Sequence, residues 1–300
     1  MRRFIFQTTI FILLVVVSVY LIFLQADGSS DNFYLRFTTD AQSSLILGNS
    51  RAAQGIRPDV LNRELQRNDI YNYSFTLTTS RYGEVYLESI KKKLKPESKG
   101  GIFILSVDPW SVSDRTDLKN TDARSMLATT PVVNIRPNFF YLFRNYDRPY
   151  FHLLLKRKSN VFLHDDGWLE VSVKTDSASV NNRIESKVAL YSSYPALNKV
   201  SENRLKYLQN TIQFLKSKGE VYLVRLPVHP RIWDIEMQLS PDFESLMREV
   251  AMENGVSFFD FTPLNSQVTF TDGNHLEKSS AAVISKHIGD SIKLTMALAD

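Results

Sequence analysis

A serine at residue 50 stands where the chain could place a nucleophile. The stretch from Leu45 to Ile56 reads LILGNSRAAQGI, so an apolar run ends at Gly48-Asn49-Ser50 and a run of helix-forming residues follows. A small hydroxyl residue at such a corner often caps a helix. It can also attack a substrate if another part of the chain supplies a general base.

A carboxylate and an imidazole near the other end of the chain could supply that base. The stretch from Phe270 to Leu276 reads FTDGNHL, which puts Asp272 three residues before His275 at the start of a helical pattern. The carboxylate can hold one imidazole nitrogen and leave the other free to take a proton from a hydroxyl. Ser50, Asp272 and His275 are therefore candidate catalytic residues. The alternative is that Ser50 only caps a helix and that the Asp-x-x-His spacing is accidental.

The elements that must position these residues follow an alternating pattern. Short apolar runs predict strands, and longer amphipathic runs predict helices between them. The expected strands are Ser44–Leu47, Ile70–Phe75, Ile102–Val107, Val221–Leu226 and Val256–Phe259. The expected helices are Pro58–Gln66, Gly83–Lys95, Glu202–Lys218, Pro241–Asn254 and Ser279–Met296. This order predicts an α/β fold, a three-layer α/β/α sandwich with a central parallel sheet.

Further candidates stand near the predicted carboxyl ends of the strands, where sites gather in parallel sheets. Asp108 could position a substrate hydroxyl or only cap a turn. Arg225 and His229 could both face the cleft, although His229 could equally be a structural histidine between two prolines. Arg51 could hold an anionic group or a sugar, or form a surface salt bridge.

The first residues of the chain predict a membrane anchor. The segment from Phe4 to Leu24 is almost wholly apolar, and at about 1.5 Å per residue it can cross a hydrocarbon core of roughly 30 Å. Two arginines precede it, which predicts a cytoplasmic amino terminus and an extracytoplasmic domain. A cleaved signal peptide is the alternative, but its apolar region is usually shorter and ends in an A-x-A-like site. We therefore expect a single-pass anchor in the cell membrane.

The chain is expected to divide into an anchor over residues 1–25, a tether over 26–42 and a domain over 43–300. An insertion at about 110–198 interrupts the alternating pattern. Within it, the stretch from Val161 to Val171 predicts a β-hairpin with Asp166-Gly167 at its turn. The insertion is expected to pack on the sheet domain and to shape a substrate cleft.

Composition excludes several kinds of chemistry. The chain contains no cysteine, so disulfides, thiolate catalysis and Cys-ligated zinc are excluded. The net charge of +4 falls to +2 without Arg2 and Arg3, and this near balance does not predict a nucleic-acid partner. The five histidines lack the short paired spacing of a metal site, and no phosphate-binding glycine loop is present. We therefore expect neither a metal nor an organic cofactor.

The two motifs and the element order together resemble the SGNH (GDSL-like) hydrolase family. The resemblance implies a flavodoxin-like SGNH fold, with Ser50 as the nucleophile, His275 as the general base and Asp272 as its orienting partner. In the family motif that carries the nucleophile, this sequence has Asn49 where the family usually has Asp. Two further family motifs supply oxyanion donors, a glycine amide and an asparagine side chain, and this sequence does not match either motif. A backbone amide near Ser80 is the candidate for one, and the stretch after the third strand, with Asp108, lacks the Gly-x-Asn-Asp of the other.

The anchor and the divergent middle are similar to membrane-bound members of that family. These include the D-alanine transfer protein of teichoic-acid modification and proteins of polysaccharide O-acetylation. The similarity implies ester hydrolysis or acyl transfer on acylated cell-envelope glycans, beside a multispanning acyltransferase as a partner. The alternative is a non-catalytic binding or assembly component of an envelope polysaccharide machinery.

Overall fold

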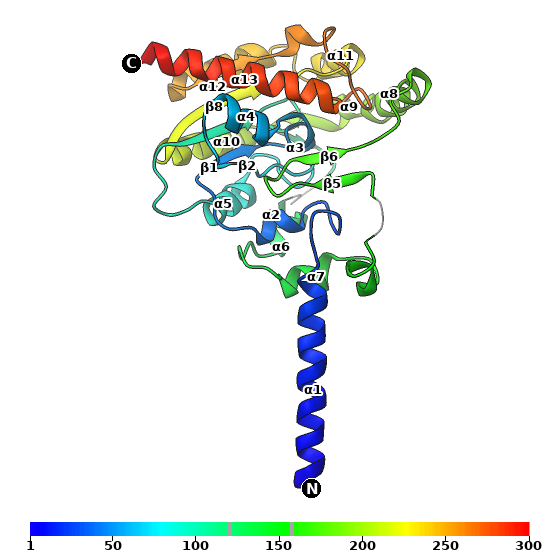
Figure 1. The fold of residues 1–300 in the computed structure, drawn as a ribbon. Helices are drawn as coiled ribbons and strands as arrows, with labels where there is room; N and C mark the ends of the chain where they lie inside the picture. The colour runs from blue at the N-terminus through cyan, green and yellow to red at the C-terminus, as the bar shows by residue number, and fades with distance from the viewer. Residues whose placement is uncertain (119–121, 157–158, 300) are drawn as a thin grey trace.

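Five parallel strands form the sheet at the centre of the fold (Figure 1). The computed structural model describes residues 1–118, 122–156 and 159–299. The strand order is β2-β1-β3-β8-β9. These strands are β1 Ser44–Leu47, β2 Ile70–Asn72, β3 Gly101–Ser106, β8 Gly219–Arg225 and β9 Ser257–Asp260. All five expected strands are present, β1 with the expected ends and the other four with shifted ends, and the parallel sheet of an α/β fold is confirmed.

The two faces of the sheet pack against different helices because successive side chains of a strand point to opposite faces. On one face, Leu45 and Leu47 of β1 belong to a core that includes side chains of α5, α10 and α12. On the other face, Ile46 packs with side chains of α3, α4 and α13. The helices are α3 Ser50–Gly55, α4 Pro58–Glu64, α5 Glu84–Lys93, α10 Glu202–Lys216, α12 Phe243–Asn254 and α13 Lys278–Ala299.

The amino-terminal helix α1 (Arg2–Phe23) projects from the domain as a single rod (Figure 1). It is long and apolar enough to span a membrane. Its last residue does not lie free, because Phe23 is 2% exposed and belongs to the main core. α1 and the domain are thus joined by packed side chains.

Residues 26–42, expected to form a tether, are instead packed into the domain. These residues include Ala26, which is fully buried, and α2 (Tyr34–Thr38), all of whose residues are buried. Arg36 of α2 donates hydrogen bonds to the carbonyls of Asn72, at 3.3 Å, and Gly167, at 2.8 Å. A polar sequence here predicted a solvated linker, but aromatic residues and a buried arginine make the segment part of the domain.

The insertion begins after β3 and ends before α10. A short two-stranded sheet joins its two ends. Strands β4 (Ser113–Arg115) and β7 (Asn198–Val200) pair antiparallel. The expected hairpin is confirmed as β5 (Val161–Leu163) and β6 (Leu169–Val171). The remaining elements are η1 Asp122–Arg124, α6 Met126–Thr129, α7 Phe139–Asn145, η2 Tyr150–Leu153, α8 Ser177–Tyr191, α9 Tyr194–Leu197, α11 Pro230–Leu239 and η3 Thr262–Leu264.

A buried lysine joins α5, α2 and the insertion. The Lys93 ammonium donates hydrogen bonds to the Thr39 carbonyl at 2.5 Å and to the Asn134 side-chain oxygen at 3.2 Å, and it lies over the Tyr71 ring. Burial lowers the pKa of Lys93 to about 7 from its usual 10.5. In the unfolded chain the same amine keeps its ordinary pKa.

This lysine predicts that stability rises with pH. Between about pH 7 and 10.5 the unfolded chain binds a proton at Lys93 that the folded chain lacks, so the free energy of unfolding should increase by up to about 1.4 kcal/mol per pH unit. Denaturant unfolding in detergent at several pH values measures this slope. Lys93→Met should remove the Lys93 contribution, whereas Lys92→Met, at an exposed position of the same helix, should keep it. Equal slopes for wild type and Lys93→Met would contradict the prediction.

Candidate active site

A tight corner after β1 presents Ser50. Gly48 has a φ of +146°, and a Cβ atom there would lie 2.8 Å from the Ser106 Cβ of the neighbouring strand. Only glycine fits this close approach. Asn49 then caps α3 by accepting a hydrogen bond from the Arg51 amide at 3.0 Å. Ser50 becomes the first residue of the helix and remains partly exposed.

Ser50, His275 and Asp272 lie in one hydrogen-bonded row, although 225 residues separate the serine from the histidine. Ser50 Oγ is 2.8 Å from His275 Nε2. His275 Nδ1 lies 2.9 Å from Asp272 Oδ2 and 3.0 Å from Oδ1. This order fits a hydroxyl that donates to Nε2 and an Nδ1–H that donates to the carboxylate. The structure therefore brings the three expected residues together with the geometry of a nucleophile, a base and an orienting acid.

Asp272 is held as a carboxylate. Burial raises its pKa, but the hydrogen bond and charge of His275 and the ammonium of Lys187, 3.1 Å away, outweigh burial and hold the pKa well below its usual range. The same carboxylate accepts hydrogen bonds from the backbone amides of Asn274 and His275, each at 3.0 Å. These hydrogen bonds hold the loop from Asp272 to His275 in one conformation and so fix the position of the imidazole.

Asn274, inside the Asp-x-x-His motif, is a site residue that the sequence analysis missed. Its side-chain nitrogen lies 3.3 Å from His275 Nε2. Its side-chain oxygen accepts two hydrogen bonds from Arg51, at 3.0 Å from Nε and 2.7 Å from Nη2. Because the guanidinium can only donate, the amide NH2 must face the Ser50 and His275 side. The only sign of Asn274 in the sequence was its position inside the Asp-x-x-His motif, because its partner Arg51 is 223 residues away.

Arg51 lies beneath the site and not on the surface. It is 4% exposed, and its third nitrogen, Nη1, contacts Glu236 at 2.5 Å. Burial lowers the pKa of Arg51, but the charges of Glu236 and Asp108 outweigh burial and raise it. The expected contact of Arg51 with an anionic group or a sugar is not available in this arrangement, because all its nitrogens face protein partners.

Asp108 and Ser80 also support the corner from below. Asp108 is 2% exposed and accepts a hydrogen bond from the side-chain nitrogen of Asn49, Nδ2, at 2.7 Å. Ser80 is fully buried, its hydroxyl donates to the Gly48 carbonyl at 2.7 Å, and its backbone amide donates to Thr76. Ser80 therefore cannot offer its own amide to an oxyanion, and the expected donor near Ser80 stays a prediction.

Arg225 and His229 take different places. Arg225 is 1% exposed, contacts Glu236 at 3.1 Å and lies 4.2 Å from the Trp233 ring centre, so it does not reach a cleft. His229 is partly exposed and lines a cavity of about 490 Å³ with Phe270 and Ile184, beside the 272–275 loop. Burial, with the charge of Arg231, lowers the pKa of His229. Only His229 of this pair keeps a position from which it could contact a substrate.

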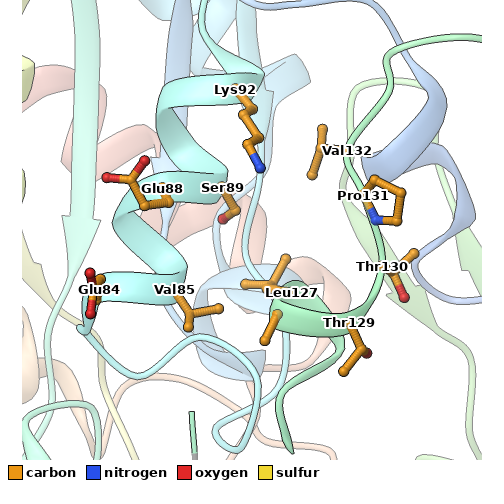
Figure 2. Close-up of a pocket in the computed structure, with 11 residues that line it drawn as sticks. Glu84, Val85, Glu88, Ser89, Lys92, Leu127, Thr129, Thr130, Pro131 and Val132 are labelled. Atoms are coloured by element: carbon orange, nitrogen blue, oxygen red, sulfur yellow. The ribbon is translucent and has the colours of Figure 1, made fainter. Parts of the chain in front are cut away.

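Two further cavities differ in whether they border the triad, by which we mean Ser50, His275 and Asp272. A cavity of about 290 Å³ is bordered by Asp272, Lys187 and Arg183. A cavity of about 430 Å³ lies between α5 and the segment 127–132, and Figure 2 shows that neither a triad residue nor Asn274 lines it. Among the described residues there is no group of three or more His, Asp or Glu side chains that could hold a metal ion.

The comparisons with known proteins leave the geometry as the only guide to function. The chain matches no protein-family model, and no curated protein is significantly similar to it.

Proposed function

We propose that this chain is a membrane-anchored serine esterase or O-acyltransferase of the SGNH type that acts on acylated cell-envelope glycans. The observation that carries the proposal is the row of Ser50, His275 and Asp272 at hydrogen-bond distances. The strand order β2-β1-β3-β8-β9, with helices against both faces, supports a flavodoxin-like three-layer sandwich. The site lies where such folds place it, at the carboxyl end of β1.

The triad can carry out acyl transfer in two steps. In the first, Ser50 Oγ bonds to the ester carbonyl carbon while its proton passes to His275 Nε2, and the sugar oxygen then leaves with that proton. In the second, water or another hydroxyl gives its proton to Nε2 and attacks the acyl carbon. The bond between that carbon and Ser50 Oγ then breaks, and Nε2 returns the proton to Oγ, which restores Ser50 and the neutral imidazole. Asp272 stays ionised and stabilises the imidazolium in both steps.

The oxyanion of each tetrahedral intermediate needs donors, and two are positioned. Ser50 is the first residue of α3, so its amide has no acceptor within the helix. The Asn274 amide nitrogen faces the Ser50 and His275 side because Arg51 holds its oxygen. We assign Asn274 the part of a side-chain oxyanion donor. In this way the site compensates for the missing Gly-x-Asn-Asp block.

The anchor supports the location. Arg2 and Arg3 stand at the start of α1, before its apolar residues, which favours a cytoplasmic amino terminus and a domain on the extracytoplasmic side. Ester-bearing glycans of the envelope are the acyl donors or acceptors that lie within reach there. A multispanning acyltransferase remains the partner that this placement favours.

Labelling with a fluorophosphonate tests the proposal on the purified full-length protein in detergent. The probe phosphonylates a serine only where a base activates it. We expect wild type to be labelled, Ser50→Ala to be unlabelled and His275→Ala to be labelled far more slowly. Ser192→Ala, which changes an exposed serine, should label like wild type.

The same experiment separates the enzyme from the binding component. Unlabelled wild type that nevertheless binds an acylated glycan would contradict catalysis and favour a non-catalytic role in an envelope assembly.

A further inference from the structure

The junction between α1 and the domain carries an exposed apolar surface, which we call the aromatic collar. It consists of side chains of α7 and of the segment around η2 that are 38–67% exposed: Phe139, Phe140, Phe143, Phe151, Leu154 and Leu155. Soluble surfaces seldom gather so many large apolar side chains in one place. Figure 1 shows α7 where α1 meets the domain.

The collar is continuous with the membrane helix. The Phe23 ring of α1 lies 5.4 Å from the ring of Phe139 and 5.3 Å from that of Phe143. Tyr20, one turn earlier in α1, lies 6.2 Å from Phe139. Side chains of the insertion therefore sit at the same level along α1 as its last turn.

The length of α1 sets the depth of that level. From Phe4 to Phe23 the helix rises about 30 Å, which equals the thickness of a typical hydrocarbon core. If Arg2 and Arg3 remain at one membrane surface, Phe23 emerges at the other. The collar then lies in the interfacial layer, where the Phe and Leu side chains of an amphipathic segment are buried at the boundary of headgroups and acyl chains.

The charges near the collar agree with a lipid surface. The segment 131–156 has four basic side chains, Arg136, Arg144, Arg148 and Lys156, against one acidic side chain, Asp147. All five are exposed. Lys156 pairs with Asp27 and Arg148 with Asp147, so Arg136 and Arg144 carry the excess positive charge. Such a surface is attracted to anionic headgroups.

We propose that the aromatic collar inserts into the membrane interface beside α1, so that lipid, and not a second protein, covers it. The collar and α1 would then hold the domain in one orientation on the bilayer. This inference does not depend on the chemistry of Ser50.

Single cysteines test the proposal, because the chain has none of its own. Full-length Phe140→Cys, Phe151→Cys and Leu155→Cys carry an environment-sensitive dye after reconstitution into vesicles of phosphatidylcholine and phosphatidylglycerol. Met252→Cys, on α12 and 77% exposed, is the matched control outside the collar, and Leu13→Cys reports on α1. Lipid-borne and aqueous quenchers are compared at each position.

We expect the lipid-borne quencher to act several-fold more strongly on the three collar labels and on Leu13→Cys than on Met252→Cys. Collar labels as open to the aqueous quencher as Met252→Cys would overturn the proposal. Collar labels protected from both quenchers would also overturn it, since only a second copy of the chain could then cover the collar. A water-exposed label at Leu13→Cys would disprove the anchor and, with it, the collar.

Discussion

Replacing His275 with alanine should lower kcat/KM for ester hydrolysis by about 10⁴-fold or more. His275 Nε2 is 2.8 Å from Ser50 Oγ, and its other ring nitrogen is held by Asp272, so no other described side chain stands in the same row to take the serine proton. The measurement is the release of acyl groups from an aryl ester and from acetylated sugars by the full-length protein in detergent.

The control and the double variant make this result specific. His287→Ala changes an exposed histidine of α13 and should leave the rate within a factor of about two. Because triad residues act as a unit, Ser50→Ala combined with His275→Ala should be about as slow as either single variant. A His275→Ala enzyme within about tenfold of wild type would exclude the triad mechanism.

Asn274→Ala should lower kcat by about 10²–10³-fold and leave KM nearly unchanged, which is typical of the loss of one oxyanion donor. The reason is that the Asn274 amide nitrogen, turned by Arg51 toward the reacting pair, contributes mainly when negative charge develops on the carbonyl oxygen. Steady-state kinetics with the same esters measures the effect. Asn182→Ala, at an exposed position of α8, is the matched control and should behave like wild type.

A pH profile separates an oxyanion donor from a residue that only orients His275. Loss of a donor should lower kcat equally at all pH values, whereas loss of a residue that only orients His275 should change the shape of the pH profile. Arg51→Lys keeps the positive charge beside Glu236 but loses the two-pronged contact with Asn274, so its rate should fall between those of wild type and Asn274→Ala. Wild-type kcat in Asn274→Ala would rule out this role.

The sequence predicted those parts of the fold that carry local signals. β1, β3, β8 and β9 each contain a short apolar run, and these runs located the strands within two residues. α8 was missed because only Ile184 and Tyr191 of its fifteen residues are buried, so it has almost no apolar stripe. α11 was missed as well, although its proline at the first position is a typical start for a helix.

The candidate site divides in the same way. Ser50, Asp272 and His275 were found because each stands in a short motif. The functions of Arg51, Asp108 and Arg225 could not be read from neighbours in the sequence, since their partners Asn274, Asn49 and Glu236 are set by tertiary packing. The prediction of a tether was wrong for the same reason, because Arg36 is buried against carbonyl groups that lie far away in the sequence.

The buried end of α1 bears on what happens if a protease separates this helix from the domain. A protease that cut after Leu24 would take Phe23 out of the core, where loss of such a ring costs about 3–5 kcal/mol. The released domain would therefore have a lower free energy of unfolding than the intact chain. The packed junction therefore favours a domain that stays attached to α1.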